Sequence, residues 1–191
     1  MTATLTDAQM RRIPVAGALA SSLPSGGIQR GTVIAIGGAT GAGATSAALM
    51  LAAAATQAGE WAAIVDPGSL GGKAAVSMGV ALERCAVVRD VPPDRWAVVV
   101  GALIDGMTMV CAAMPGRLAL GDARRLQARA RQRQSIIVIL ESVPGMQVGS
   151  WPGEAAIRIH VGLDETGHRY YDITGKGVPH DVRHLRLARA G

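Results

Sequence analysis

The residues best placed to do chemistry form a short glycine-rich turn that runs from Gly38 to Thr45 and reads Gly-Ala-Thr-Gly-Ala-Gly-Ala-Thr. Its spacing is that of a phosphate-binding loop, GxxxxGK[ST]. In such a loop, backbone N–H groups at a helix N-terminus bind phosphate, a lysine neutralises the outer phosphates, and a hydroxyl holds Mg²⁺. Gly38, Gly41 and Gly43 keep the turn and Thr45 keeps the hydroxyl, but Ala44 replaces the lysine. The spacing fits a vestigial phosphate loop and an ordinary glycine-rich turn equally well. Because the lysine is replaced, we expect no bound cofactor.

The segments on either side of this turn alternate between short apolar runs and helical runs, which is typical of a parallel sheet covered by helices. A strand is predicted at 32–36, a helix at 45–57 and a second strand at 61–65. The same alternation then predicts helices at 93–104 and 120–134 and buried strands at 108–113 and 135–140. The expected fold class is therefore α/β, with a mostly parallel central sheet.

After Glu141 the sequence changes to alternating apolar and polar residues, as in strands with one solvated face. Such strands are predicted at 157–161, 169–173 and 182–187. The last of them is expected to be an edge strand, folded up to about Leu187, with Arg183, Arg186 and Arg189 available to a partner. The predicted organisation is an N-terminal helix (6–12) and loop (21–27) within 1–27, a core at 28–175, and a basic C-terminal segment at 176–191.

Composition narrows the class of protein. The 191 residues are 49% hydrophobic and 17% charged, which excludes a disordered chain and fits one domain with short appendages. Cys85 and Cys111 lie far apart without metal-ligand spacing and are expected to be reduced, buried thiols. The apolar stretch 96–114 contains Asp105, so we expect a turn at Asp105–Gly106 rather than a membrane span, and a cytoplasmic protein. Trp61 and Trp96 are expected in the core.

The helix predicted at 120–134 is strongly basic. Ala123 and Leu126 mark a narrow apolar face, while the arginines spread over the remaining surface, and Asp122 alone offsets them locally. A solvated helix face explains this pattern, and so does a docking face for DNA phosphates or an acidic partner. The net charge of +5 permits the second interpretation. The candidate contact residues on this helix are Arg124, Arg125, Arg129 and Arg131.

From Gly31 onward the order of residues resembles the core of RecA. RGTVIAIGGATGAGATS resembles its first core strand, phosphate loop and helix start, and WAAIVDPGSLGGKAAVSMGV resembles its second strand and the acidic turn beyond. In RecA that turn carries a glutamate that positions the attacking water, and Gly68 stands at the matching position. The stretch 107–114, which resembles the strand bearing the metal-binding aspartate, contains no acid. The resemblance implies a RecA-like fold that does not hydrolyse ATP.

Small RecA-like chains of this kind also resemble the ImuA family, in particular its short ImuA′ form, over about 17–190. That resemblance implies a non-enzymatic accessory protein of a DNA-damage-induced (SOS) translesion-synthesis mutasome, which joins the nucleoid on damage. The partners it implies are an ImuB-like polymerase homologue and an error-prone C-family polymerase, with RecA and DNA as further candidates and no membrane. Two alternatives remain open. One is a SulA-like inhibitor of the division GTPase, and the other is a weak ATPase completed by a partner's Arg or Lys in trans.

Overall fold

The computed structural model describes residues 11–66, 68, 70–178 and 184–186. Most of the helix predicted at 6–12 lies outside these residues. The elements, in chain order, are β1 (Arg12–Pro14), α2 (Ala18–Ser22), η1 (Pro24–Gly26), β2 (Gly27–Gln29), β3 (Val33–Gly38), α3 (Ala44–Gln57), β4 (Ala62–Val65), α4 (Gly72–Ser77), η2 (Leu82–Arg84), β5 (Cys85–Val88), α5 (Trp96–Gly106), β6 (Met109–Ala113), α6 (Leu120–Arg133), β7 (Ile136–Leu140), β8 (Ile157–Leu163), β9 (Arg169–Gly175) and β10 (His184–Arg186).

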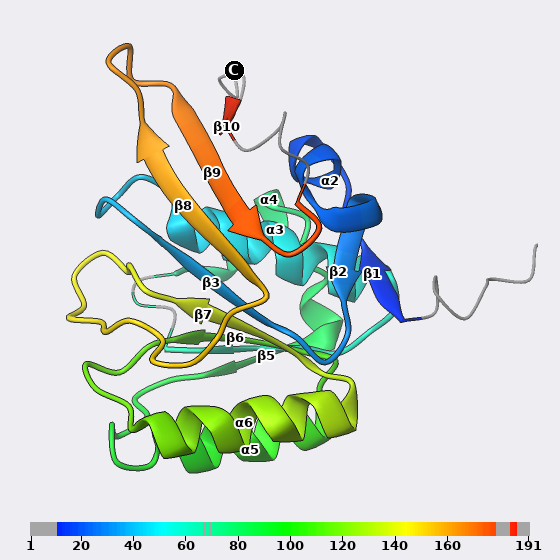
Figure 1. Cartoon of the computed structure of the whole chain (residues 1–191), viewed down its shortest axis with the longest axis vertical. Helices are drawn as coiled ribbons and strands as arrows, with labels where there is room; N and C mark the ends of the chain where they lie inside the picture. The colour runs from blue at the N-terminus through cyan, green and yellow to red at the C-terminus, as the bar shows by residue number, and fades with distance from the viewer. Residues whose placement is uncertain (1–10, 67, 69, 179–183, 187–191) are drawn as a thin grey trace, which may run out of the picture.

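The main sheet has eight strands in the order β10-β9-β8-β3-β7-β6-β4-β5. The strands from β8 to β5 are parallel, whereas β8, β9 and β10 pair antiparallel. Helices α5 and α6 cover one face of the sheet, and α3, together with the N-terminal segment, lies on the other (Figure 1). This arrangement confirms the predicted α/β class and its mostly parallel sheet. The glycine loop follows β3, near the middle of the sheet.

The core has one apolar cluster on each face of the sheet. Ile34 and Ile36 of β3 face the α3 side, whereas Val33 faces the α5–α6 side. A strand that is covered on both faces needs apolar residues at every position, which explains the continuous runs in β3, β4, β6 and β7. Helix α3 packs its many alanines against the sheet, and Ala47, Ala52 and Ala55 are fully buried there.

The N-terminal segment is more ordered than the sequence suggested. The stretch 21–27, predicted as a loop, contains the end of α2, the 3₁₀ turn η1 and the first residue of β2. Strands β1 and β2 form a two-stranded antiparallel ribbon in which Ile13 pairs with Ile28. Both side chains are buried in the α3-side core, as are Leu19 and Leu23. The segment therefore packs as part of the core and does not form a separate appendage.

Three further expectations need correction. Trp61 is 48% exposed and not a core residue, whereas Trp96 is buried, with its Nε1 donating to the carbonyl of Ala113 at 2.9 Å. The predicted turn at Asp105–Gly106 forms the last residues of α5. The short strand β5 and the helix α4 were not predicted, because neither has a distinct apolar period in the sequence. β5 occupies one edge of the sheet.

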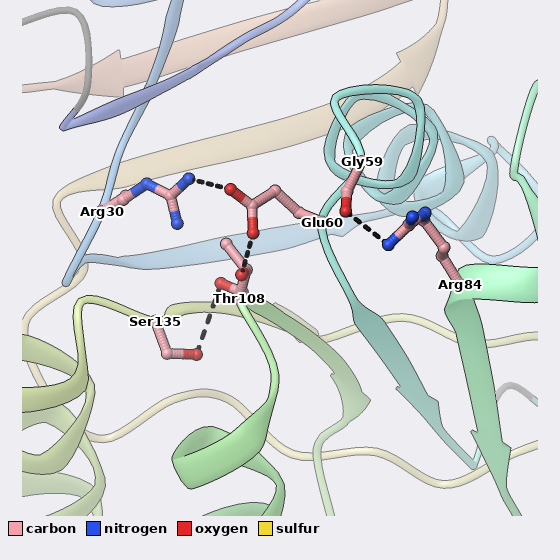
Figure 2. A network of polar contacts seen from close by, with 6 residues as sticks. All are labelled: Arg30, Gly59, Glu60, Arg84, Thr108 and Ser135. Carbon is pink, nitrogen blue, oxygen red and sulfur yellow. Dashed lines mark hydrogen bonds and ion pairs between the residues drawn. The ribbon is translucent and has the colours of Figure 1, made fainter.

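A network of polar contacts joins the segments that precede the strands (Figure 2). The carboxylate of Glu60, just before β4, pairs with the Arg30 guanidinium and accepts a hydrogen bond from Thr108 Oγ1 at 2.7 Å. Arg84 donates to the carbonyl of Gly59 at 2.7 Å. Burial raises the pKa of Glu60, but the bonds from Thr108 and Arg30 and the charges of Arg30 and Arg84 outweigh it, so the pKa lies below its ordinary value. This network joins the amino ends of β3, β4, β5 and β6.

Glu60→Gln should therefore destabilise the fold in a pH-dependent way. A carboxyl whose pKa is lowered in the folded state adds stability above its unfolded pKa of 4.5 and loses it as pH falls through the folded value. We expect the variant to lose about 1 kcal/mol of unfolding free energy at pH 7, after allowance for solvent screening. The difference from wild type should vanish in urea titrations near pH 3. Glu83→Gln, at an exposed site without this network, is the matched control, and an equal loss in both variants would contradict the prediction.

Gly38 should tolerate no side chain. Its φ is +139°, and a Cβ built there would lie 2.0 Å from the carbonyl oxygen of Val161, its partner in β8. At Gly41, where φ is +82°, a Cβ would meet nothing within 4 Å. Gly41→Ala should therefore cost only the backbone strain, about 1–2 kcal/mol, whereas Gly38→Ala should cost clearly more because β3 and β8 must separate. Urea unfolding of both variants checks this, and equal losses would refute it.

Candidate functional site

The glycine loop lies between the carboxyl end of β3 and the N-terminus of α3, as the phosphate-loop motif requires. Gly38, Gly41 and Gly43 all have positive φ angles, of 139°, 82° and 114°. Gly43 is the N-cap of α3, a helix of 14 residues whose first N–H groups therefore border the loop. The helix dipole adds partial positive charge at the same place. The loop thus keeps the backbone features of an anion site.

The side chains of the motif are only partly kept. Ala44, at the lysine position, is the first residue of α3 and is 4% exposed. The Oγ1 atom of Thr45, at the hydroxyl position, is buried and has no hydrogen-bond partner among the described residues. A cavity of about 170 Å³ opens beside the loop. It is lined by Gly41, Gly43, Ala44, Thr45, Ser46, Ser142, Pro144 and Arg169.

Arg169 is the residue of this site that the sequence did not reveal. It opens β9, where it pairs with Leu163 of β8, and its Nε donates to the carbonyl of Ala42 at 2.6 Å. A Cβ on Gly43 would lie 2.6 Å from the guanidinium carbon, so the glycine lets the guanidinium lie against the loop backbone. Only the pairing of β8 with both β3 and β9 brings it there. No local sequence signal could have found it.

The positions that carry acids in a RecA-type site either have no carboxylate here or have one that makes a structural hydrogen bond. The strand β6 ends in Ala113 and Met114, both buried and without a carboxylate. Gly68, at the position of the water-positioning glutamate, has a φ of +65°, and its carbonyl accepts a hydrogen bond from Arg89 at 2.9 Å. Asp66 accepts from the backbone N–H of Val91 at 3.3 Å, which ties β4 to the chain after β5.

Glu141 is the acid nearest to the base of the loop. It follows β7, and one of its carboxylate oxygens lies 3.4 Å from the point where a Cβ on Gly37 would stand. The same carboxylate accepts from the N–H of Trp151 at 2.7 Å and pairs with Arg158 at 3.3 Å. Its charge is therefore matched by an arginine of β8. Glu141 therefore orders the chain after β7.

The basic helix α6 packs beside α5, and several of its arginines already have acidic partners. Asp105 of α5 pairs with Arg129 and with Arg133, the latter at 3.1 Å. Hydrogen bonds from Arg129, despite some desolvation, lower the pKa of Asp105 to about 2. Arg125 pairs with Asp122 at 3.1 Å. The expectation that Asp122 alone offsets the basic charge was therefore wrong, because α5 supplies a second acid. The exposed arginines without a described ion pair include Arg117, Arg124 and Arg131.

The candidate contact residues at the C-terminus are only partly described. Arg183 and Arg189 lie outside the described residues. Arg186 belongs to β10, where its backbone pairs with Tyr170 of β9. The predicted third strand is thus present as β10, and it forms the edge of the main sheet beyond β9.

Other groups that could react are held in inert surroundings. Burial raises the pKa of the Cys111 thiol, and of the half-buried Cys85 thiol, above the ordinary value, so both disfavour the reactive thiolate. Among the residues described, no group of three or more His, Cys, Asp or Glu is placed to hold a metal ion. None of the described helices is long and apolar enough to cross a membrane. The glycine loop with Arg169 is therefore the strongest candidate site.

Comparison with known proteins supports this architecture. The chain matches 93% of its length to 94% of a KaiC-like protein from the hyperthermophilic archaeon Pyrococcus horikoshii OT3, with a TM-score of 0.68 and 18% sequence identity. This likeness confirms the expected RecA-like fold. Rv3395c of Mycobacterium tuberculosis, an uncharacterized protein, is 38% identical over 112 residues, which are 58% of this chain. Those residues cover 51% of Rv3395c, so the chain spans about half the length of that relative.

The model of the MT3502 N-terminal domain matches residues 21–145, which is more than half of the chain. The matched region contains the glycine loop, the acid-free strand β6 and the basic helix α6, and it ends shortly after β7. Arg169 and the antiparallel strands β9 and β10 lie outside it. The chain belongs to the MT3502 N-terminal domain family.

Proposed function

We propose that this chain is a non-enzymatic RecA-like domain that acts by binding other macromolecules, as an accessory protein of DNA-damage-induced translesion synthesis. The observation that supports it most directly is a phosphate loop with intact backbone whose catalytic positions carry Ala44, Gly68 and an acid-free β6. Phosphoryl transfer depends on positioning and charge neutralisation, so losing the lysine, the metal-side acid and the water-positioning acid together removes the chemistry. Binding is the function that remains for the fold.

The mutasome assignment comes from the resemblance to the ImuA family, and the partners are proposed on that ground. They are an ImuB-like polymerase homologue and an error-prone C-family polymerase in the cytoplasm, with RecA and DNA as further partners at the nucleoid. Two surfaces suit such contacts. One is the exposed face of α6 with Arg124 and Arg131, and the other is the β10 edge, where a partner strand can pair with the backbone.

The first prediction of this proposal concerns ATP. Isothermal titration with Mg-ATP should show no micromolar binding, and phosphate-release assays should show no turnover. Ala44→Lys alone should not restore hydrolysis, because no carboxylate stands at the end of β6 or at Gly68 to hold the metal or position water. Turnover that needs an added partner would instead support the trans-completed ATPase. Turnover by the isolated chain would refute the proposal outright.

The second prediction concerns the exposed arginines of α6. The double variant Arg124→Glu/Arg131→Glu should stay folded, since exposed substitutions cost within about 0.5 kcal/mol each. It should bind duplex DNA or the purified ImuB-like partner more weakly. For DNA, the slope of log affinity against log salt should fall by about one unit per phosphate-contacting arginine. Fluorescence anisotropy at several salt concentrations measures both effects.

Lys73→Glu/Arg95→Glu is the matched control, because it changes the net charge equally at exposed sites that do not belong to α6. If both double variants weaken binding to the same extent, the effect is one of net charge and α6 is only a solvated helix face. If neither variant affects DNA or the ImuB-like partner, the docking surface lies elsewhere. Cell filamentation on overexpression, with no effect on damage-induced mutagenesis, would favour the SulA-like alternative.

A further inference from the structure

We propose that the glycine loop is a metal-free binding site for a phosphate group, in which Arg169 of the β9 strand supplies the cation that Ala44 no longer provides. This inference goes beyond the proposed adaptor function, because it assigns a ligand to a loop whose catalytic groups are gone. It concerns the isolated chain and does not depend on any partner. The argument rests on the charge of Arg169, its unused hydrogen-bond donors, the loop cavity and the orphaned hydroxyl of Thr45.

The guanidinium of Arg169 has a net charge that the structure does not neutralise locally. Among the described residues, no carboxylate lies within ion-pairing distance of it, and the groups that it contacts, the Ala42 carbonyl and the Tyr171 hydroxyl, are neutral. Glu141, beside the base of the loop, is paired with Arg158. An arginine held beside a helix N-terminus, with no acid of the described residues in ion-pairing distance of it, gives a positive local field.

The guanidinium also has hydrogen-bond donors that are available to a ligand. Arginine presents five N–H donors in a planar fork, a geometry that suits phosphate oxygens. One of them, the Nε–H, donates to the carbonyl of Ala42 at 2.6 Å, and the guanidinium also contacts the Tyr171 hydroxyl, which leaves further donors of the fork for a ligand. Arg169 lines the loop cavity, so these donors border the same space as the first turn of α3.

Thr45 provides an observation that is independent of Arg169. Its hydroxyl atom is buried and has no partner among the described residues, although Thr45 lines the cavity. A buried hydroxyl left without a partner is destabilising, and a ligand oxygen would satisfy it. The cavity of about 170 Å³ exceeds several-fold the ~30 Å³ that one water occupies in the liquid, so a phosphate group has room.

These features define the chemistry of the ligand. Backbone N–H groups of the loop, the Thr45 hydroxyl and the Arg169 fork are all donors, which suits an oxyanion with several acceptor oxygens. Among the described residues that line the cavity, none has a carboxylate that could hold Mg²⁺. The ligand is therefore a phosphate group bound without metal. Free phosphate, polyphosphate and the phosphate tail of a nucleotide all present this group, and the experiment below distinguishes them.

The test is a titration of the ¹⁵N-labelled chain, followed by the backbone amide signals of residues 41–46. Potassium phosphate, tripolyphosphate, ATP without metal and adenosine are compared at constant ionic strength, with chloride as the reference salt. We expect saturable shifts confined to the loop, with a dissociation constant on the order of millimolar for phosphate. Adenosine should give none. Tighter binding of tripolyphosphate than of phosphate, with no further gain for ATP, would identify the phosphate chain alone as the ligand; a further gain for ATP would add the nucleoside.

Three variants assign the residues. Arg169→Gln should weaken phosphate binding about tenfold, and Arg169→Lys should retain most of it. Thr45→Val should weaken binding about fivefold and at the same time raise the thermal stability of the free chain, because it removes a buried hydroxyl that has no partner. Weaker phosphate binding together with higher thermal stability would identify the Thr45 hydroxyl as a group that binds the ligand. Arg124→Gln, an equal loss of charge on α6, should leave the loop titration unchanged.

Several outcomes would overturn the proposal. One is the absence of loop shifts with phosphate and tripolyphosphate in the wild-type chain. Another is unchanged affinity in Arg169→Gln while its amide spectrum shows the native fold. A third is a shift pattern centred on the arginines of α6, which would reveal nonspecific anion binding. None of these results bears on partner binding by α6, so failure of this inference is distinguishable from failure of the proposed adaptor function.

Discussion

The backbone of β3 approaches β8 at Gly38 so closely that the Val161 carbonyl occupies the space of a side chain. This contact fixes where β3 ends and the glycine loop begins. It also fixes β8, and through the antiparallel register of β8 with β9 it places Arg169 beside the loop. The cavity, the cation and the start of α3 all depend on this one backbone approach. A glycine at this position is therefore a requirement of the sheet as much as of the loop.

Acidic side chains at the carboxyl ends of the strands make structural contacts. Asp66 holds the chain after β5, and Glu141 orders the chain after β7 with Arg158. The turn of the glycine loop is structural as well, because it connects β3 with α3.

The charged side chains of this protein form two kinds of arrangement, a network at the amino ends of the strands and a partly paired surface on α6. At the amino ends of the strands, Glu60 and Arg30 pair within a network that ties the sheet together. On α6, part of the basic charge is matched by Asp105 and Asp122, and the remainder stays exposed. Pairing at the helix surface is weakly stabilising, because water and salt screen it. The exposed remainder is what a phosphate backbone or an acidic partner could use.

The sequence by itself determined the secondary structure of the core and the state of the catalytic positions. Continuous apolar runs such as 135–140 predicted the buried strands, and the helices at 45–57 and 120–134 were predicted nearly to their ends, because their periodicity is local. Ala44 could likewise be identified by the spacing of the loop motif, and Gly68 and the acid-free β6 by the resemblance to RecA. The short elements, α2, α4 and β5, were missed because tertiary packing, and not local propensity, stabilises segments of this length.

Only the tertiary structure decided the contacts between segments that lie far apart in the chain. Arg169 lies 127 residues from the carbonyl that it binds, and Asp105 pairs with arginines 24 and 28 residues further on. Trp61 is apolar and precedes the buried strand β4, yet it is 48% exposed. These contacts and exposures depend on the order of the strands and on which helix covers which face of the sheet. The periodicity of the sequence gives neither the strand order nor the position of the helices. The sequence therefore showed that the loop has an alanine at the lysine position of the motif, and the fold showed that Arg169 lies beside the loop.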